Sequence, residues 1–454
     1  MSILNFKRKK MKKIKNIILL FAIAIGLSSC ADNFIETEPT TAVSPEALIT
    51  DIPSARGAVN GLYDRLQQTY VTGGYNAFLT GLFADELSHV GSFPSLAEFA
   101  SNDIDLNNIE NTRYWTDHFE TINAANIIID KLQEVDIDSE VSAELTAQAK
   151  AVRAFMYYRL VKVYGGVPLA LTGNLSATDI DKNPLARSSE SEVYDQIMQD
   201  LSDALADIRP SGSLYFFNEN SVRVLKALVE MELEKYPEAE ATLAPVIGEY
   251  TLANSYADLF GGNANTQEGI FAINFADFDG NSYAFYYLES GGRYEVAPSG
   301  DLLAAFEEGD NRTSQIIGED PQIFKFKDPG SGSDDVYIFR YSHVLLMQAE
   351  LLARKGDATA SDYINMVRNR AGLGDVNLDS SNFIDLIAHE RFVEFYGEDT
   401  DRLFTLTRLG IADEEISSKD NNTFIPERNN LWPIPQQEIE RNSAISIEDQ
   451  NPGY

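Results

Sequence analysis

Neighbouring acidic residues are the first side chains in this sequence that could do chemistry, because a glycosidase needs two carboxyl groups about 5 to 9.5 Å apart. Asp85-Glu86 and Glu307-Glu308 are examples. The chain holds 70 acidic residues, however, so such pairs arise from composition alone. A zincin motif, a Gly-x-Ser-x-Gly elbow, a phosphate-binding glycine loop and a dinucleotide fingerprint are all missing. We therefore predict no catalytic residue and no cofactor.

The residues that could bind a metal are not grouped into a recognisable site either. The histidines are scattered, and we expect His343 and His389, which lie in predicted helices, to be core or capping residues. Two runs alternate acids and amides, Asp103-x-Asp105-x-Asn107 and Asp277-x-Asp279-x-Asn281. Neither has the glutamate that closes an EF-hand loop at its twelfth position, so we interpret both as solvated turns. The sequence predicts no metal site but leaves a structural calcium open.

The only cysteine follows a targeting segment. Lys7 to Lys15 carries seven cations and no acid, and Ile17 to Leu27 is an apolar run of about eleven residues. A bilayer span takes about 20 residues, so this is a secretory signal and not a membrane anchor. Leu27-Ser28-Ser29-Cys30 resembles the lipobox of bacterial lipoproteins, which implies that Cys30 is lipidated. The alternative is a stray thiol in a discarded signal peptide.

Aromatic residues in predicted loops are the candidates for ligand contact. Sugar rings pack their C–H groups against flat apolar faces, and amide or guanidinium groups bind their hydroxyls. The candidates are Tyr75, Phe93, Asn281, Tyr283, Tyr286, Tyr287, Arg293 and Tyr294. The run from Tyr283 to Tyr287 could instead be a strand with alternate residues buried. For Trp115 and Trp432 we expect packing roles.

Helical periodicity dominates the elements that must position these residues. The predicted helices are Pro45 to Gln68, Asn111 to Leu132, Ser139 to Tyr164, Ser188 to Ile208 and Ser221 to Tyr236. Ser44-Pro45-Glu46 is typical of a helix start, and Gly165-Gly166 of a helix end.

Two helical hairpins are also predicted, and small residues stand where their helices would cross. The first joins Val222–Lys235 to Glu238–Ile247, and the second joins Tyr341–Arg354 to Ala360–Arg370. The small residues are Ala227, Ala239, Ala241, Ala349, Ala353 and Ala360. The pattern is similar to degenerate tetratricopeptide repeats of about 34 residues, although ordinary helical hairpins explain it equally well.

Between the hairpins, Gly261 to Gly332 is rich in Gly, Asn, Asp and Tyr. Short β-like runs are predicted at Gly269 to Phe275 and Gln322 to Lys327. Long loops held by a rigid scaffold often contact ligands, so this insertion is a candidate binding region.

Composition excludes one class of partner. The formal charge is -34, with 36 Lys and Arg against 70 Asp and Glu, and an extended nucleic-acid contact needs clustered cations. At 44% hydrophobic residues the chain is typical of a globular protein.

Several segments resemble the SusD/RagB family of outer-membrane nutrient-binding lipoproteins. They read AQAKAVRAFMYYRLVKVYGGVPL at Ala147 to Leu169 and FRYSHVLLMQAELLARKGDATASDYINMVRNRAGL at Phe339 to Leu373. Further matches are HERFVEFYGEDTDRLFTLTR at His389 to Arg408, and LWPIPQQEIERN and QNPGY at Leu431 to Asn442 and Gln450 to Tyr454. Asp310-Asn311-Arg312 also matches a habit of the family, and there we expect a structural salt bridge.

The resemblance implies an all-α fold, a SusD-like scaffold of degenerate tetratricopeptide repeats with a loop-rich insertion containing short β segments. The expected regions are a signal peptide (1–29), a lipidated tether (30–44), an N-terminal helical region (45–260) and a C-terminal region with the insertion (261–454). The implied function is capture of oligo- or polysaccharide at the cell surface, without catalysis, for a SusC-like TonB-dependent transporter. Peptide capture on the same scaffold and a surface glycoside hydrolase are the alternatives. The sequence names neither the glycan nor the state of the transporter complex.

Overall fold

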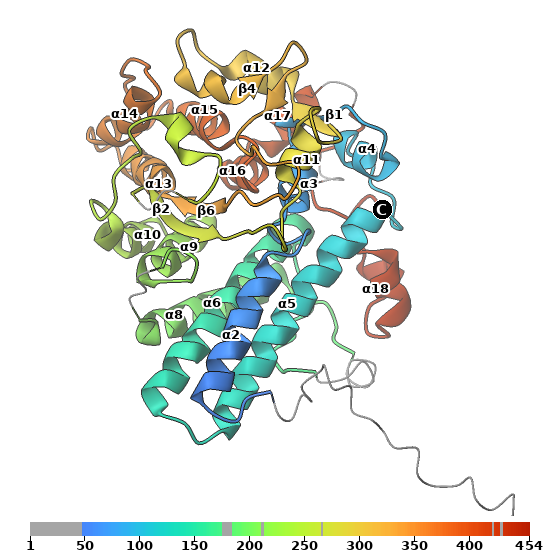
Figure 1. Cartoon of the computed structure of the whole chain (residues 1–454). Helices are drawn as coiled ribbons and strands as arrows, with labels where there is room; N and C mark the ends of the chain where they lie inside the picture. The colour runs from blue at the N-terminus through green and yellow to red at the C-terminus, as the bar shows by residue number, and fades with distance from the viewer. Residues whose placement is uncertain (1–47, 175–183, 210–212, 265–266, 420–421, 427–429) are drawn as a thin grey trace, which may run out of the picture. The chain divides into compact units, whose positions relative to one another are not determined.

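The structure, a computed structural model, is built mainly of helices with a few short strands (Figure 1). It describes residues 48–174, 184–209, 213–264, 267–419, 422–426 and 430–454. The longer helices are α2 (Ile52–Leu66), α3 (Tyr75–Phe83), α5 (Ile109–Glu134), α6 (Ser139–Tyr164), α8 (Glu190–Asp207), α9 (Glu219–Glu232), α10 (Tyr236–Leu243), α13 (Tyr341–Arg354), α14 (Ala360–Arg370), α15 (Phe383–Phe395) and α16 (Asp401–Leu409). The shorter ones are α4 (Pro94–Ala100), α11 (Tyr283–Tyr287), α12 (Gly300–Ala305), α17 (Ala412–Ser418) and α18 (Gln436–Arg441), with 3₁₀ turns at Ala244–Val246, Tyr256–Leu259, Asn311–Gln315 and Ile447–Asp449.

The long helices α2, α5, α6 and α8 pack against one another in the lower part of Figure 1. Each begins at a side chain that accepts hydrogen bonds from the free N–H groups of its first turn. These caps are Asp51, Asn108, Asp138 and Ser189. Helix α6 ends at Gly165, which adopts a φ of +70°. The predicted helix and its glycine stop are both confirmed.

The first helix starts later than predicted. Pro45 lies outside the described residues, residues 48–51 are not helical, and α2 begins at Ile52. There Asp51 and Ser54 cap each other's backbone N–H groups, with the Ser54 N–H 2.9 Å from the Asp51 carboxylate. A reciprocal pair satisfies two free donors, which makes Asp51 the effective start.

Both predicted hairpins are present as packed helix pairs, α9 with α10 and α13 with α14. Ala227, Ala239, Ala349, Ala353 and Ala360 are fully buried, as expected for residues at helix crossings. The expectation for Ala241 is wrong, because that residue lies on the exposed face of α10.

The strands of the insertion form short antiparallel pairs, two of them with strands outside it. They are β2 (Gly269–Ile273) with β6 (Val336–Arg340), β1 (Leu87–His89) with β3 (Val296–Pro298), and β4 (Ile316–Ile317) with β5 (Gln322–Ile323). The first predicted β run is confirmed over Gly269–Ile273. The second is wrong beyond Ile323, because only two residues there find a partner strand.

A buried network of charges joins the insertion to α13, α14 and α15. The Arg340 guanidinium lies 2.9 Å from both Glu268 and Glu398, and it also pairs with Glu394. Arg312 pairs with Asp310 at 2.7 Å and with Glu390 at 2.6 Å. The expected salt bridge between Asp310 and Arg312 is thus confirmed. Removing one partner from such a network leaves an uncompensated buried charge, which costs about 3–5 kcal/mol.

Residues Ile49–Tyr454 form one compact unit, and the β1–β3 pair joins segments from both sides of the expected division near residue 260. The expected signal peptide, Cys30 and the tether lie outside the described residues. Among the helices that the structure describes, none is both long and apolar enough to cross a membrane.

Candidate ligand-binding site

The structure brings the two predicted ligand segments together. Strand β1 follows α3, and β3 lies within the insertion; they pair with Ser88 opposite Ala297 and His89 opposite Val296. Beyond the strands, the backbone N–H groups of Val90 and Gly91 donate to the carbonyl oxygen of Glu295 at 3.0 and 3.3 Å. Residues near position 90 and near position 290 therefore lie side by side, next to α3 and α11 (Figure 1).

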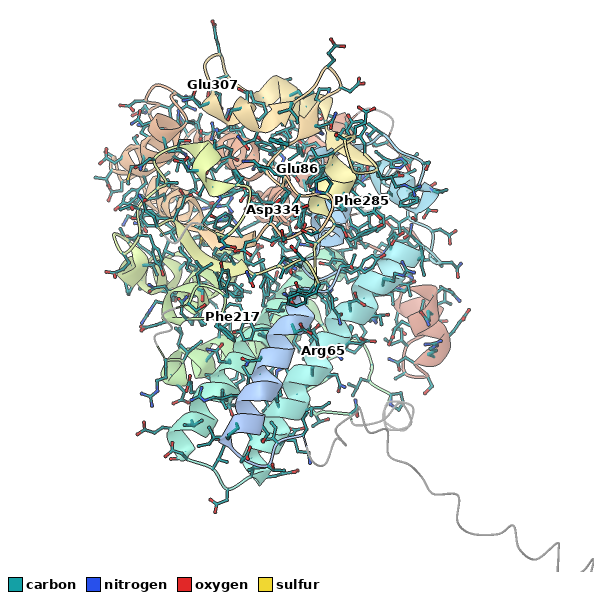
Figure 2. The ribbon with its side chains drawn as sticks, in the orientation of Figure 1. Arg65, Glu86, Phe217, Phe285, Glu307 and Asp334 are labelled. Carbon is teal, nitrogen blue, oxygen red and sulfur yellow. The ribbon has the colours of Figure 1, made fainter. Side chains whose placement is uncertain are left out.

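Tyr286 stands at the centre of an aromatic group on this surface. Its ring centroid lies 5.5 Å from Tyr75, 6.2 Å from Phe93 and 5.1 Å from Phe285. The hydroxyl oxygens of Tyr75 and Tyr286 are 3.2 Å apart. Tyr75 is buried beneath the others, Phe93 and Tyr286 are half-buried, and Phe285 is 39% exposed (Figure 2). The neighbouring rings meet at steep angles, so they form a faceted and not a flat surface.

Arg293 completes the group. Its guanidinium carbon lies 3.9 Å from the centre of the Phe93 ring, in the geometry of a cation–π contact. Its Nε donates to the Glu295 carboxylate at 2.6 Å and its Nη2 to the Ser92 hydroxyl at 3.2 Å. The side chain remains 43% exposed. We call Phe93, Phe285, Tyr286 and Arg293 the binding surface.

Four of the predicted ligand residues, Tyr75, Asn281, Tyr283 and Tyr287, are buried, so the expectation that they face a ligand from an open loop is wrong. Tyr283 and Tyr287 are fully buried and donate to the carbonyl oxygens of Glu398 and Gly397, at 2.8 and 3.3 Å. Asn281 donates to the carbonyl oxygens of Gly332 and Asp334 at 2.8 and 2.7 Å. These side chains hold the insertion in place and offer no face to solvent.

The reason is that Tyr283–Tyr287 is one turn of helix, neither a loop nor a strand. Residues four apart share a face of a helix, so Tyr283 and Tyr287 point inward together while Phe285 and Tyr286 face outward. Tyr75 also differs from expectation, because it begins α3 and is only 6% exposed. Tyr294 is half-buried and donates to the Pro321 carbonyl oxygen at 3.0 Å.

Phe285 is a member of the surface that sequence reasoning did not select. It lies within the aromatic run, but a five-residue helix is too short to show a period. If the run had been interpreted as a helix, Tyr283 and Tyr287 would share the buried face, and Phe285 would lie on the exposed face.

Residues of the two acidic pairs bind other groups of the protein. Asp85 accepts from the Arg402 guanidinium, at 2.7 Å from Nε, and Glu86 accepts from the Gly397 backbone N–H at 3.1 Å. Burial raises the pKa of Glu86 to about 8. Glu307 binds Arg368 at 2.7 Å, beyond the end of α12 (Figure 2). Asp85, Glu86 and Glu307 thus have structural partners.

The candidate metal residues also have structural partners. Asp105 accepts from the Asn107 N–H at 2.8 Å and Asp279 from the Ala276 N–H at 2.7 Å, so both form turns as expected. His343 is buried and accepts from the Arg340 N–H at the start of α13, which confirms its capping role. Within the described ranges, no three His, Cys, Asp or Glu side chains are grouped to hold a metal.

The two tryptophans pack inside the protein, as expected. Trp432 is 1% exposed, and its ring lies 4.8 Å from Phe99 and 5.1 Å from Tyr114. Trp115 is 5% exposed and its indole N–H donates to Glu438 at 3.3 Å.

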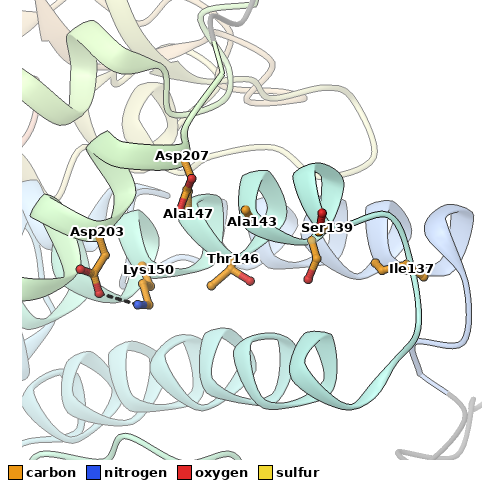
Figure 3. A pocket seen from close by; sticks show the side chains of 9 residues that line it. Ile137, Ser139, Ala143, Thr146, Ala147, Lys150, Asp203 and Asp207 are labelled. Carbon is orange, nitrogen blue, oxygen red and sulfur yellow. Dashed lines mark hydrogen bonds and ion pairs between the residues drawn. The ribbon is translucent and has the colours of Figure 1, made fainter.

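A groove of about 340 Å³ lies apart from the binding surface, between α6, α8 and the turn before α6 (Figure 3). Lys150 and Asp203 form an ion pair of 2.6 Å at one end of it. Much of the remaining lining is small, with Ala143, Thr146 and Ala147. It contains no aromatic side chain on which a sugar ring would stack.

The chain matches known families at both ends. Residues 33–213 match a family model described as "Starch-binding associating with outer membrane", and residues 322–454 match the model of the SusD family. SusD-like protein P38 of Formosa agariphila is 27% identical over 503 aligned residues, which cover 93% of this chain and 97% of the relative.

Solved structures share the fold. A SusD superfamily protein from Bacteroides vulgatus superposes with a TM-score of 0.78 at 19% identity, covering 89% of this chain and 99% of that one. A laminarin-binding SusD-like protein also gives 0.78, at 24% identity, covering 89% of this chain and all of the other. The predicted fold class, a mostly helical SusD-like scaffold with short strands, is confirmed.

Proposed function

Because this chain belongs to the SusD/RagB family, whose members are non-catalytic glycan-binding proteins associated with the outer membrane, we propose that it captures oligo- or polysaccharide at the cell surface for a SusC-like TonB-dependent transporter. The transporter moves the glycan across the membrane, and this chain supplies the capture.

The observation that carries this proposal is the binding surface itself. Phe285 is exposed and Tyr286 is half-buried, and the half-exposed Arg293 stacks on Phe93 beside them. Aromatic rings pack against the C–H faces of pyranose sugars, and guanidinium N–H groups donate to hydroxyls. Few contacts on an open surface give weak binding, on the order of micromolar to millimolar, which suits a protein that must release its cargo.

Attachment to the membrane follows from Cys30. Two or three acyl chains at that residue make attachment effectively permanent, since each buried methylene adds about 0.8 kcal/mol. Removal of the signal peptide takes away seven of the 36 cations and no acid, which leaves 29 cations against 70 acids, a formal charge of -41. This charge repels the protein from anionic headgroups, so the lipid has to hold it there.

Affinity electrophoresis against a panel of polysaccharides tests the proposal. The panel includes laminarin, which the superposed relative binds, and starch, which the N-terminal family model names. We expect at least one polysaccharide to retard the purified protein, with no new reducing ends after prolonged incubation. Sustained release of reducing ends would show an enzyme, and retardation by none of the panel would reject glycan capture.

A further inference from the structure

The Glu295 side chain lies directly behind the binding surface and is only 2% exposed. One carboxylate oxygen accepts from the backbone N–H groups of Ser92 and Phe93 at 2.7 and 3.1 Å. The other accepts from Arg293 Nε at 2.6 Å. His89 Nε2 lies 3.3 Å from the first oxygen. A single carboxylate thus contacts both segments that supply the surface.

The arrangement of donors requires a charged group at this position. A carboxylate is acceptor-only, and all the polar groups around it present N–H or O–H donors. A glutamine amide would turn its own NH₂ group toward one of those donors. Although burial alone would raise the pKa of Glu295, Arg293, the two backbone N–H groups and His89 hold it below its usual value, so the group is charged at neutral pH.

The backbone at residue 295 is held independently of this side chain. Its carbonyl oxygen accepts from Val90 and Gly91, and the β1–β3 pairing continues from there. A change confined to the carboxyl group therefore releases Ser92, Phe93 and Arg293 while the strands remain paired.

Gly91 shows how closely the loop wraps the carboxylate. A Cβ atom at this position would lie 2.0 Å from the nearer Glu295 oxygen. It would also lie 2.8 Å from the Glu295 Cα atom, so substitution of Gly91 displaces both the carboxylate and the backbone that carries it, without altering the charge. This provides a second way to disturb the same contacts.

We propose that Glu295 is a positioning residue: its carboxylate fixes Phe93 and Arg293 in the stacked arrangement that receives the glycan, without contacting the glycan itself. This inference rests on the proposed function.

The test is isothermal calorimetry with laminarin, or with whichever panel polysaccharide retards the wild-type protein. Hydrogen bonds to a charged group contribute more than those between neutral groups. Glu295→Gln should therefore weaken glycan binding about tenfold or more. Gly91→Ala should weaken it similarly. Glu289→Gln, which changes an exposed glutamate of the same insertion, is the matched control and should bind as wild type does.

A pH profile separates positioning from general damage. Wild-type affinity should fall as pH drops below 4.5, where Glu295 takes up a proton, and the Glu295→Gln variant should lack this component. His89 and Arg293 are the other titratable groups that contact the carboxylate. Glu295→Asp, which keeps the charge, should recover part of the lost affinity.

The outcomes are distinguishable. Wild-type binding to no polysaccharide rejects the proposed function and this inference with it. Wild-type binding with equal affinity in Glu295→Gln rejects only the inference. Unfolding of both Glu295→Gln and Gly91→Ala, seen by circular dichroism, also overturns it, because Glu295 would then support the fold and not the surface alone.

Discussion

Glu86 shows what burial does to a single side chain. It lies inside the protein in the turn that leads into β1 (Figure 2), where the Gly397 N–H donates to it. Burial raises its pKa to about 8 from 4.5. Between these values the folded chain holds a proton that the unfolded chain has released, so stability falls as pH rises, by about 1.4 kcal/mol per pH unit at most.

The change in the free energy of unfolding caused by Glu86→Gln should therefore be more favourable at pH 8 than at pH 5. Glutamine keeps an acceptor for the Gly397 N–H and cannot ionise. Urea unfolding at the two pH values measures the change, and we expect the difference between variant and wild type to grow by roughly 1 to 3 kcal/mol. If the difference between variant and wild type does not change with pH, the pKa of Glu86 is not raised in the folded protein.

At this scale the sequence predicted roles that depend on local chemistry. The capping role of His343, the Asp310–Arg312 ion pair and the packing of both tryptophans follow from residue type and neighbours. The inward direction of Asn281, Tyr283 and Tyr287 does not, because their partners are backbone oxygens that lie 51 to 115 residues away in the chain.

At the scale of elements, the end of α6 is set by Gly165. Its φ of +70° and ψ of -133° belong to a region that side-chain-bearing residues rarely enter. A Cβ there would also lie 3.0 Å from the Leu431 side chain. The glycine thus lets the chain leave the helix and turn toward α8.

Gly165→Ala should destabilise the protein by about 1 to 3 kcal/mol, measured by urea unfolding. Gly61→Ala is the matched control: it lies inside α2, and an added Cβ meets nothing within 4 Å. Alanine is the better helix former, so this change should stabilise by about 0.5 to 1 kcal/mol. Equal effects of the two substitutions would contradict this account of the helix end.

Elements with a clear period and clear ends were predictable, and short ones were not. Helix α6 has the predicted bounds because an apolar pattern of seven turns ends at two glycines. Helix α11 has one turn, in which helix, strand and loop patterns coincide. The start of α2 was misplaced because two capping sequences, at Ser44 and Asp51, stand close together.

At the scale of the whole molecule, contacts between distant segments hold the binding surface and the core. Arg159 on α6 binds Asp399 through two hydrogen bonds of 2.7 Å, across 240 residues of sequence. The β1–β3 pair similarly joins segments about 210 residues apart. No local pattern predicts such pairs, whereas the resemblance to a family gives the architecture that contains them.

We expect membrane attachment, a property of the whole chain, to depend on Cys30. Cys30→Ser should move the protein from the outer-membrane fraction to the soluble fraction, because it removes the sulfur atom proposed to carry the lipid. Cell fractionation with palmitate labelling measures this. Persistence of the variant in the membrane fraction would contradict lipid anchoring at this residue.

The central claim is that glycan binds at the aromatic rings of the binding surface beside Arg293. The most direct measurement is calorimetry of the double variant Phe93→Ala/Tyr286→Ala, with Tyr363→Ala on α14 as a control remote from α11 (Figure 1). We predict that the double variant loses at least about tenfold in affinity, since each aromatic contact is worth about 1 kcal/mol, while the control binds as wild type does. Unchanged affinity in the folded double variant would contradict the account.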